Sequence, residues 1–99
     1  MVLGKGLGIE EVLLPRRQQI LAIAARYGAR NVRVFGSVRR REAGSDSDVD
    51  LLVDWVRGSN RLHLEAALSS LLRREVDVIS ADRLQWYAAP DILSEAAPL

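Results

Sequence analysis

The 99-residue chain contains no cysteine, so neither disulfides nor thiolate metal sites are available to it. It also lacks an apolar run long enough to cross a bilayer. Its 14 basic and 13 acidic residues leave a formal charge of +1, whereas a dedicated duplex-DNA binder normally carries a clear basic excess. Residues 1–8 are too short and too glycine-rich for a signal peptide. These absences favour a cytoplasmic protein that binds neither membranes nor duplex DNA.

The residues that are present suit one small globular domain of the α/β class. Ninety-nine residues are enough for a single core and leave little surplus. Apolar periodicity and turn residues predict that helices and strands alternate, and residues 1–8 are expected to be loose. The expected strands are 32–35, 48–56 and 76–79. The expected helices run from Pro15 to Gly28, from Ser37 through the next few residues, over 61–74, over 81–86, and as a last turn after Pro90.

Three aspartates interrupt two of these apolar strands. Asp48 and Asp50 begin the second strand, and Asp77 lies within the third. Removing a charge from water is costly unless a partner compensates it, so two strands that both accept this cost are expected to hold a cation. Side chains alternate along a strand, so the carboxylates emerge on one surface if the Val and Leu faces pack on helices. Magnesium suits such a site because it prefers hard oxygen ligands and shares them with substrate phosphates.

Gly36 and Ser37 end the first strand and are expected to open a helix. Glycine lets the backbone approach a phosphate closely, and a helix start points N–H groups and a positive dipole end at it. The serine hydroxyl adds a further donor. At least one side chain of Arg39–Arg41 is expected to reach a phosphate oxygen. Together with the carboxylates, this turn indicates metal-dependent chemistry on a nucleoside triphosphate.

Gly36-Ser37, a ten-residue gap and Asp48-x-Asp50 resemble the signature of the minimal nucleotidyltransferases, the small branch of the DNA polymerase β-like superfamily. The likeness covers most of the chain, including the strand with Asp77 and the ending Ile92–Leu99. It implies the nucleotidyltransferase fold, a small mixed β-sheet with helices packed mainly on one face. One departure is visible. The family commonly has Arg-Gly where Arg40-Arg41 stands, so Arg41 takes the place of a glycine in the loop before Asp48.

The resemblance implies two-metal nucleotidyl transfer with two Mg²⁺ ions and ATP as substrate. Asp48 and Asp50 would hold an ion that also grips the triphosphate, and Asp77 would join them in holding a second ion near the attacking hydroxyl. Asp77 is also the best-placed general base. The predicted nucleotide ligands are Gly36, Ser37 and Arg40.

The acceptor is expected to be another protein, because so short a chain leaves no room for an acceptor-binding domain beside the catalytic core. Minimal nucleotidyltransferases are typically paired with a small helical HEPN-domain ribonuclease. The resemblance therefore implies that AMP is transferred from ATP to a tyrosine of a HEPN toxin, for which this protein is the antitoxin. The base preference, the number of nucleotides transferred and any oligomer formed with the partner stay open.

Two other functions remain as alternatives. The protein could neutralise its partner by binding alone, although the complete Gly-Ser and aspartate set counts against lost chemistry. It could instead modify a small molecule such as an aminoglycoside, which requires an acceptor cleft that a chain of this size does not readily build unless a dimer forms it.

Several residues also have a purely structural interpretation. The three aspartates could be solvated strand acids, and Arg39–Arg41 could form a solvated helix face. His63 is expected at the surface, and Ser45, Asp46 and Ser47 are expected to be turn residues. The aromatic residues Trp55, Trp86 and Tyr87 suit either the core or a contact with a protein partner.

Overall fold

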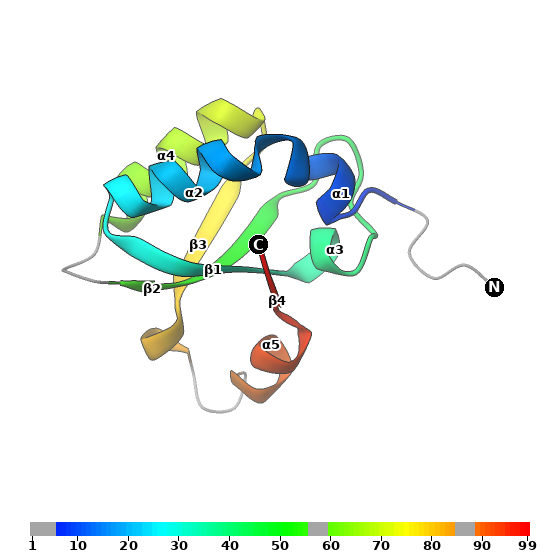
Figure 1. The fold of residues 1–99 in the computed structure, drawn as a ribbon. Coiled ribbons are helices and arrows are strands. Elements are labelled where there is room, and N and C mark those ends of the chain that lie inside the picture. Colours follow the sequence, from blue (N-terminus) through cyan, green and yellow to red (C-terminus); the bar gives the residue numbers. More distant parts are fainter. Residues whose placement is uncertain (1–5, 56–59, 85–88) are drawn as a thin grey trace.

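A computed structural model describes residues 6–55, 60–84 and 89–99 of the chain. Its centre is a four-stranded mixed sheet in the order β3-β2-β1-β4 (Figure 1). β2 runs antiparallel to β1 and parallel to β3, and β4 pairs antiparallel with the other side of β1. The strands are β1 Ala29–Phe35, β2 Val49–Trp55, β3 Val76–Ser80 and β4 Ala97–Pro98. The mixed sheet and its helices confirm the predicted fold class.

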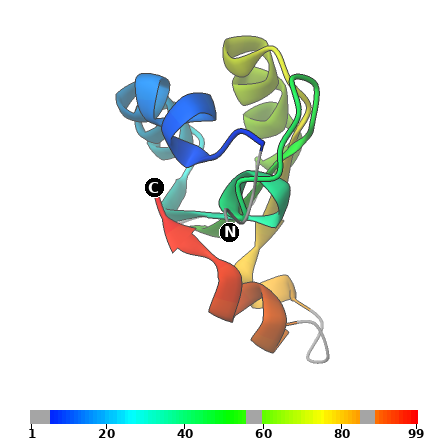
Figure 2. The ribbon, with the colours of Figure 1, turned by 90° about the vertical axis from the view of Figure 1, so that its right-hand side faces the viewer.

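The helices cover the two faces of this sheet unequally. α2 (Arg17–Arg26) and α4 (Arg61–Leu72) lie side by side over one face, whereas α5 (Ala89–Glu95) lies on the opposite side (Figures 1 and 2). α3 (Gly36–Arg39) follows β1 directly. The shorter elements are α1 Ile9–Val12 and the 3₁₀ helices η1 Leu14–Arg16 and η2 Ala81–Arg83. In the described part of the chain, no helix has the length and hydrophobicity that a bilayer crossing requires.

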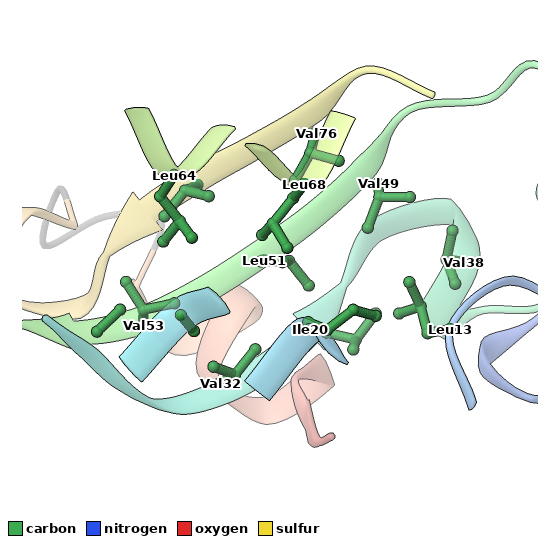
Figure 3. Close-up of a cluster of buried hydrophobic side chains, with 14 of the residues drawn as sticks. Leu13, Ile20, Val32, Val38, Val49, Leu51, Val53, Leu64, Leu68 and Val76 are labelled. Carbon is green, nitrogen blue, oxygen red and sulfur yellow. The ribbon is translucent and has the colours of Figure 1, made fainter. Parts of the chain in front are cut away.

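The core lies between the sheet and the pair α2 and α4. Every second residue of β2, namely Val49, Leu51 and Val53, is fully buried, and Leu64 and Leu68 of α4 pack against this row (Figure 3). Burying each such side chain contributes about 1.5–3 kcal/mol. The predicted alternation is therefore confirmed, and it directs the intervening residues of β2 and β3 to the other face of the sheet.

β3 pairs with β2 on one side, and its outer edge is held by side chains of α4. The N–H of Val76 donates to Ser69 Oγ at 3.1 Å, and the N–H of Val78 donates to Glu65 Oε2 at 2.7 Å. These contacts occupy two outward donors that a foreign strand could otherwise pair with. They also fix the strand that carries Asp77.

The N-terminal region differs from the prediction. The part of residues 1–8 that the structure describes is not loose, because Leu7 pairs with Ala43 and the N–H of Gly6 donates to the carbonyl of Arg41 at 2.9 Å. α1 follows at once, and the fully buried Leu13 anchors this segment to the core. Residues 1–5 lie outside the described residues.

Other boundaries also shift, and one strand was missed. The expected helix from Pro15 divides into η1 and α2, β1 begins at Ala29, and α4 ends at Leu72 because Arg73 adopts a left-handed φ of 56°. The expected last turn is the longer α5. β4 was not predicted, because it has only two residues and Pro98 has no N–H to donate. The helix expected over 81–86 is only the 3₁₀ helix η2, because Leu84 is already extended with φ −65° and ψ 136°. Residues 85–86 and the end of the expected second strand lie outside the described residues.

Candidate active site

Pairing of the two parallel strands places two of the predicted aspartates next to each other. Asp50 of β2 is the register partner of Asp77 of β3, and Asp48 immediately precedes β2. Asp50 is half-buried, whereas Asp48 and Asp77 are exposed. Burial raises the pKa of the Asp50 carboxyl, and the negative charges of Asp77 and Asp48 raise it further. The structure thus brings Asp77 and Asp48 close enough to Asp50 for their charges to act on its carboxyl.

This carboxylate set fits magnesium in its chemistry. All three side chains offer hard oxygen donors, and a cation would relieve the repulsion at Asp50. Among the described residues, however, no three acidic or histidine side chains are close enough together to hold an ion as they stand. A cation held by all three carboxylates would therefore require their side chains to rearrange.

Gly36 packs directly against Asp50. Its φ is +76°, a backbone conformation that favours glycine, and Phe35 before it is the register partner of Asp50. A Cβ at position 36 would lie 3.0 Å from Cγ of Asp50 and closer still to a carboxylate oxygen. Only glycine fits here without displacing the aspartate. The two predicted halves of the site, the Gly36-Ser37 turn and the carboxylates, therefore meet.

α3 begins at this turn, with Gly36 and Ser37 as its first two residues. Both are half-buried, and Val38, which follows, is buried in the core and anchors the helix. Residues at a helix start have N–H groups without intrahelical partners, so the turn presents donors beside the carboxylates. The phosphate-binding role of the two residues stays a prediction.

Glu95, at the end of α5, is a site residue that the sequence did not reveal. Its carboxylate accepts the N–H of Gly36 at 2.9 Å and a guanidinium N–H of Arg40 at 2.7 Å. Burial alone would raise the pKa of Glu95, but these two hydrogen bonds and the charge of Arg40 outweigh it and lower that pKa. The contact with Gly36 spans 59 positions, so no local pattern could have indicated it.

Arg40 forms hydrogen bonds with two carboxylates of the protein. Besides Glu95, its guanidinium donates to Glu42 at 3.1 Å, and the hydrogen bond to Glu95 is the largest of the effects that raise the pKa of Arg40. Arg39 donates to the carbonyl of Glu95 at 2.8 Å. Arg40 therefore lies beside the Gly36 turn, and a phosphate bound there would share its guanidinium with the carboxylates of Glu95 and Glu42.

Arg41, which stands where the family pattern has glycine, adopts a left-handed backbone conformation. Its φ is +60°, which costs a residue with a side chain about 1 kcal/mol. An ion pair with Glu11, 2.9 Å between Arg41 Nη1 and Glu11 Oε1, holds the side chain. The departure from the family pattern thus leaves a glycine-like backbone at this position in the loop.

Arg74 fixes the rest of the loop before Asp48. Its Nη1 donates to the carbonyls of Gly44 at 2.8 Å and Ser47 at 3.0 Å. The hydroxyl of Ser47 accepts the N–H of Gly44 at 2.7 Å, as expected of a turn residue. Arg74 follows α4 and reaches the loop only in the folded chain, so no local sequence pattern indicates this contact.

Several other predicted residues lie elsewhere. His63 is exposed, as expected, but it has a partner: its ring stacks on Tyr27 with 6.4 Å between ring centroids. This pair lies beyond the start of β1, at the opposite end of that strand from Gly36. Trp55 packs against the core and donates its indole N–H to Ser80. Trp86 and Tyr87 lie outside the described residues.

A hollow of about 390 Å³ adjoins the site between α1 and α3. Gly8, Val38 and Arg39–Arg41 contribute to its lining, and none of the three aspartates does. The hollow therefore borders the arginine side of the turn and not the carboxylates.

The sequence also matches known proteins. Residues 16–98 match the nucleotidyltransferase domain family. Over 90 residues the chain is 37% identical to protein adenylyltransferase MntA of Thermococcus cleftensis, and the alignment covers 88% of each chain. Over 83 residues it is 31% identical to a Methanocaldococcus jannaschii protein named as a protein adenylyltransferase, covering 81% of this chain and 89% of that one.

Solved structures agree with this assignment. A structure described as that of a minimal nucleotidyltransferase superposes with a TM-score of 0.78 at 43% identity, over 97% of this chain and all of the other. A toxin–antitoxin structure with AMP-PNP shares the fold, with a TM-score of 0.72 at 19% identity over 82% of this chain and 69% of that one. The chain belongs to the nucleotidyltransferase domain family, and it is a nucleotidyltransferase.

Proposed function

We propose that this enzyme, with Mg²⁺, transfers AMP from ATP to a tyrosine hydroxyl of a HEPN-domain ribonuclease toxin and thereby acts as its antitoxin. The observation that carries the proposal is the position of Asp50, which lies between Asp77 on the neighbouring strand and the Gly36 turn. Carboxylates for a cation and backbone donors for phosphate are thus side by side, as phosphoryl-type transfer requires.

The residues of the chain would divide the work as follows. Asp48 and Asp50, with Asp77, would hold magnesium, which when bound neutralises charge on the triphosphate and the leaving pyrophosphate. The N–H of Gly36 is bonded to Glu95, so the other N–H groups at the start of α3 and the hydroxyl of Ser37 would orient the phosphates against the Gly36-Ser37 turn. Asp77 is exposed, so its carboxylate can face an incoming protein and accept the proton of the attacking hydroxyl. The new bond joins that oxygen to the α-phosphorus, and pyrophosphate leaves.

A protein acceptor is supported by size and by the relatives. The compact chain consists of one small sheet and its helices, and the relative that is 37% identical over 88% of each chain is named a protein adenylyltransferase. A fold neighbour is a toxin–antitoxin structure with AMP-PNP, which supports an adenine nucleotide and a toxin partner. The tyrosine and the HEPN domain are inferred from the resemblance of the sequence to minimal nucleotidyltransferases.

The test is transfer of label from [α-³²P]ATP, in the presence of Mg²⁺, to a co-expressed toxin encoded by a neighbouring gene. We expect adenylyl mass on a tyrosine of the toxin. Asp77→Asn should lose turnover while it retains nucleotide binding, because the substitution removes the base and one metal ligand but leaves the phosphate turn intact. Asp82→Asn, which alters an exposed acid on η2, is the matched control and should leave transfer unchanged.

Each alternative function has its own outcome in this assay. Full transfer by Asp77→Asn would remove Asp77 from the mechanism. An Asp50→Asn variant that transfers nothing yet still neutralises the toxin would favour inhibition by binding alone. Label that appears on an aminoglycoside and not on any protein would favour a small-molecule acceptor.

A further inference from the structure

Glu95 joins the two predicted phosphate-binding groups through one carboxylate. Its Oε2 accepts the N–H of Gly36 at 2.9 Å, and its Oε1 accepts from Arg40 at 2.7 Å. We propose that Glu95 is a positioning residue of the nucleotide site, which fixes the Gly36 turn and the Arg40 guanidinium relative to each other from the C-terminal helix α5. This role rests on the proposed function, because it concerns the turn that is assigned there to phosphate.

The turn needs such a support because glycine does not hold its own conformation. Gly36 has φ +76° and must keep this geometry to remain packed against Asp50. Glycine populates many backbone conformations with similar ease, so an external partner is required to select one. A hydrogen bond to an ionised carboxylate is among the stronger contacts that a backbone N–H can make.

The fold also explains how α5 brings Glu95 to this place. β4 begins two residues after Glu95 and pairs with β1, with Val34 opposite Ala97 and Arg33 opposite Pro98. β1 leads directly into Gly36, so the pairing aligns the end of α5 with the start of α3 (Figures 1 and 2). The C-terminal strand therefore sets the position of the carboxylate.

The Arg40–Glu95 ion pair is more enclosed than the Arg40–Glu42 ion pair. The Glu95 side chain is 25% exposed, whereas the Glu42 side chain is 54% exposed. Glu95 also accepts, through its backbone carbonyl, the side chain of Arg39. An exposed pair such as Arg40–Glu42 contributes little to order, so Glu42 provides a matched control that shares the arginine but does not touch the turn.

The experiment compares Glu95→Ala, Glu95→Gln and Glu42→Ala in the full chain by two measurements. ATP affinity with Mg²⁺ is expected to fall about tenfold in Glu95→Ala, which equals the loss of one hydrogen bond to a charged group. Glu95→Gln keeps an acceptor for the Gly36 N–H and should be intermediate. Glu42→Ala should stay within about twofold of the wild type. In the protein without nucleotide, NMR should show about tenfold faster hydrogen exchange of the Gly36 amide in Glu95→Ala.

Other results would overturn the proposal. If Glu95→Ala binds ATP as well as the wild type, or if its Gly36 amide exchanges no faster, Glu95 positions nothing. Tighter ATP binding would show that the carboxylate competes with phosphate for these donors. If Glu95→Ala fails to fold, the ATP affinity of Glu95→Gln decides the question, and its melting temperature shows whether that variant is folded. A wild-type protein that binds no ATP contradicts the proposed function itself and this role with it, whereas normal wild-type binding and an unaffected variant contradict only the role of Glu95.

Discussion

The face of the sheet that packs on α2 and α4 carries aliphatic residues, whereas the opposite face carries Asp50 and Asp77 at paired positions. Leu51, next to Asp50 in the chain, is fully buried among helix side chains. Asp50 itself is half-buried against Asp77, and its pKa is raised by burial and by its acidic neighbours. The same two strands thus gain stability on one face and carry an electrostatic cost on the other. The free energy gained by burying the core side chains therefore offsets the cost of placing Asp50 next to Asp77.

Leu51→Ala tests the stabilising face and should have the largest effect on stability. The side chain has no exposure, so its removal should leave a cavity and cost about 2–5 kcal/mol of unfolding free energy. Urea denaturation measures this loss. Leu62→Ala alters a leucine of α4 that is 70% exposed and should change stability by no more than about 0.5 kcal/mol. Equal effects of the two substitutions would contradict the assignment of the core.

Gly36→Ala tests the junction between the two halves of the site. Alanine is strained at φ +76°, and its Cβ would collide with the Asp50 carboxylate. We expect a loss of about 1–3 kcal/mol in stability, together with weaker ATP binding. Gly44→Ala is the matched control, because a Cβ there meets side-chain atoms only at ordinary distances, 3.5 Å or more. A Gly36→Ala protein with normal stability and normal ATP affinity would show that the turn does not depend on its close packing against Asp50.

Glu65→Ala tests how the carboxylate-bearing edge strand is held. It would leave the N–H of Val78 without its acceptor, which should cost about 1–3 kcal/mol. Hydrogen exchange of the Val78 amide, measured by NMR, should accelerate. Glu75→Ala, which removes a more exposed side chain at the start of β3, should leave that amide protected. Protection that survives in Glu65→Ala would show that α4 does not secure the edge.

Asp50→Asn and Asp54→Asn should change stability in opposite directions and by the smallest amounts. The two residues share a face of β2, but the pKa of Asp50 is raised, whereas that of Asp54 is lowered, first by the hydrogen bond from Asn31 and then by Arg33. At neutral pH we therefore expect Asp50→Asn to be slightly more stable than the wild type. Asp54→Asn should be less stable by up to about 1 kcal/mol.

The pH dependence of these differences follows from the two pKa directions. The contribution of Asp50 to the free energy of unfolding is fully present below the usual pKa of an aspartate. It is lost as pH rises through the raised pKa of Asp50 in the folded protein. The contribution of Asp54 to the free energy of unfolding is present above the usual pKa of an aspartate. It is lost as pH falls through the lowered pKa of Asp54 in the folded protein. Both differences from the wild type should therefore shrink in acid, as urea denaturation at several pH values would show. A less stable Asp50→Asn at neutral pH would contradict the destabilisation that burial and the neighbouring acids impose on the charged Asp50.

The sequence predicted those parts of the site that depend on local patterns. Alternating apolar residues around Asp50 and Asp77 indicated the strands and their common face, and the glycine at the end of β1 indicated the turn. The supports of the site were not predictable in this way. Glu95 and Arg74 reach their partners only through tertiary packing. β4, which aligns Glu95, is too short and too poor in donors to resemble a strand.

The central claim is that Asp48, Asp50 and Asp77 share a cation opposite the Gly36 turn. Titration with paramagnetic Mn²⁺ tests it most directly, because amide NMR signals near a bound ion broaden before others. We expect the earliest broadening at these three residues and at Gly36, and we expect Asp50→Asn to abolish it. Broadening spread over the other acidic residues of the chain, or unchanged in Asp50→Asn, would contradict a shared metal site.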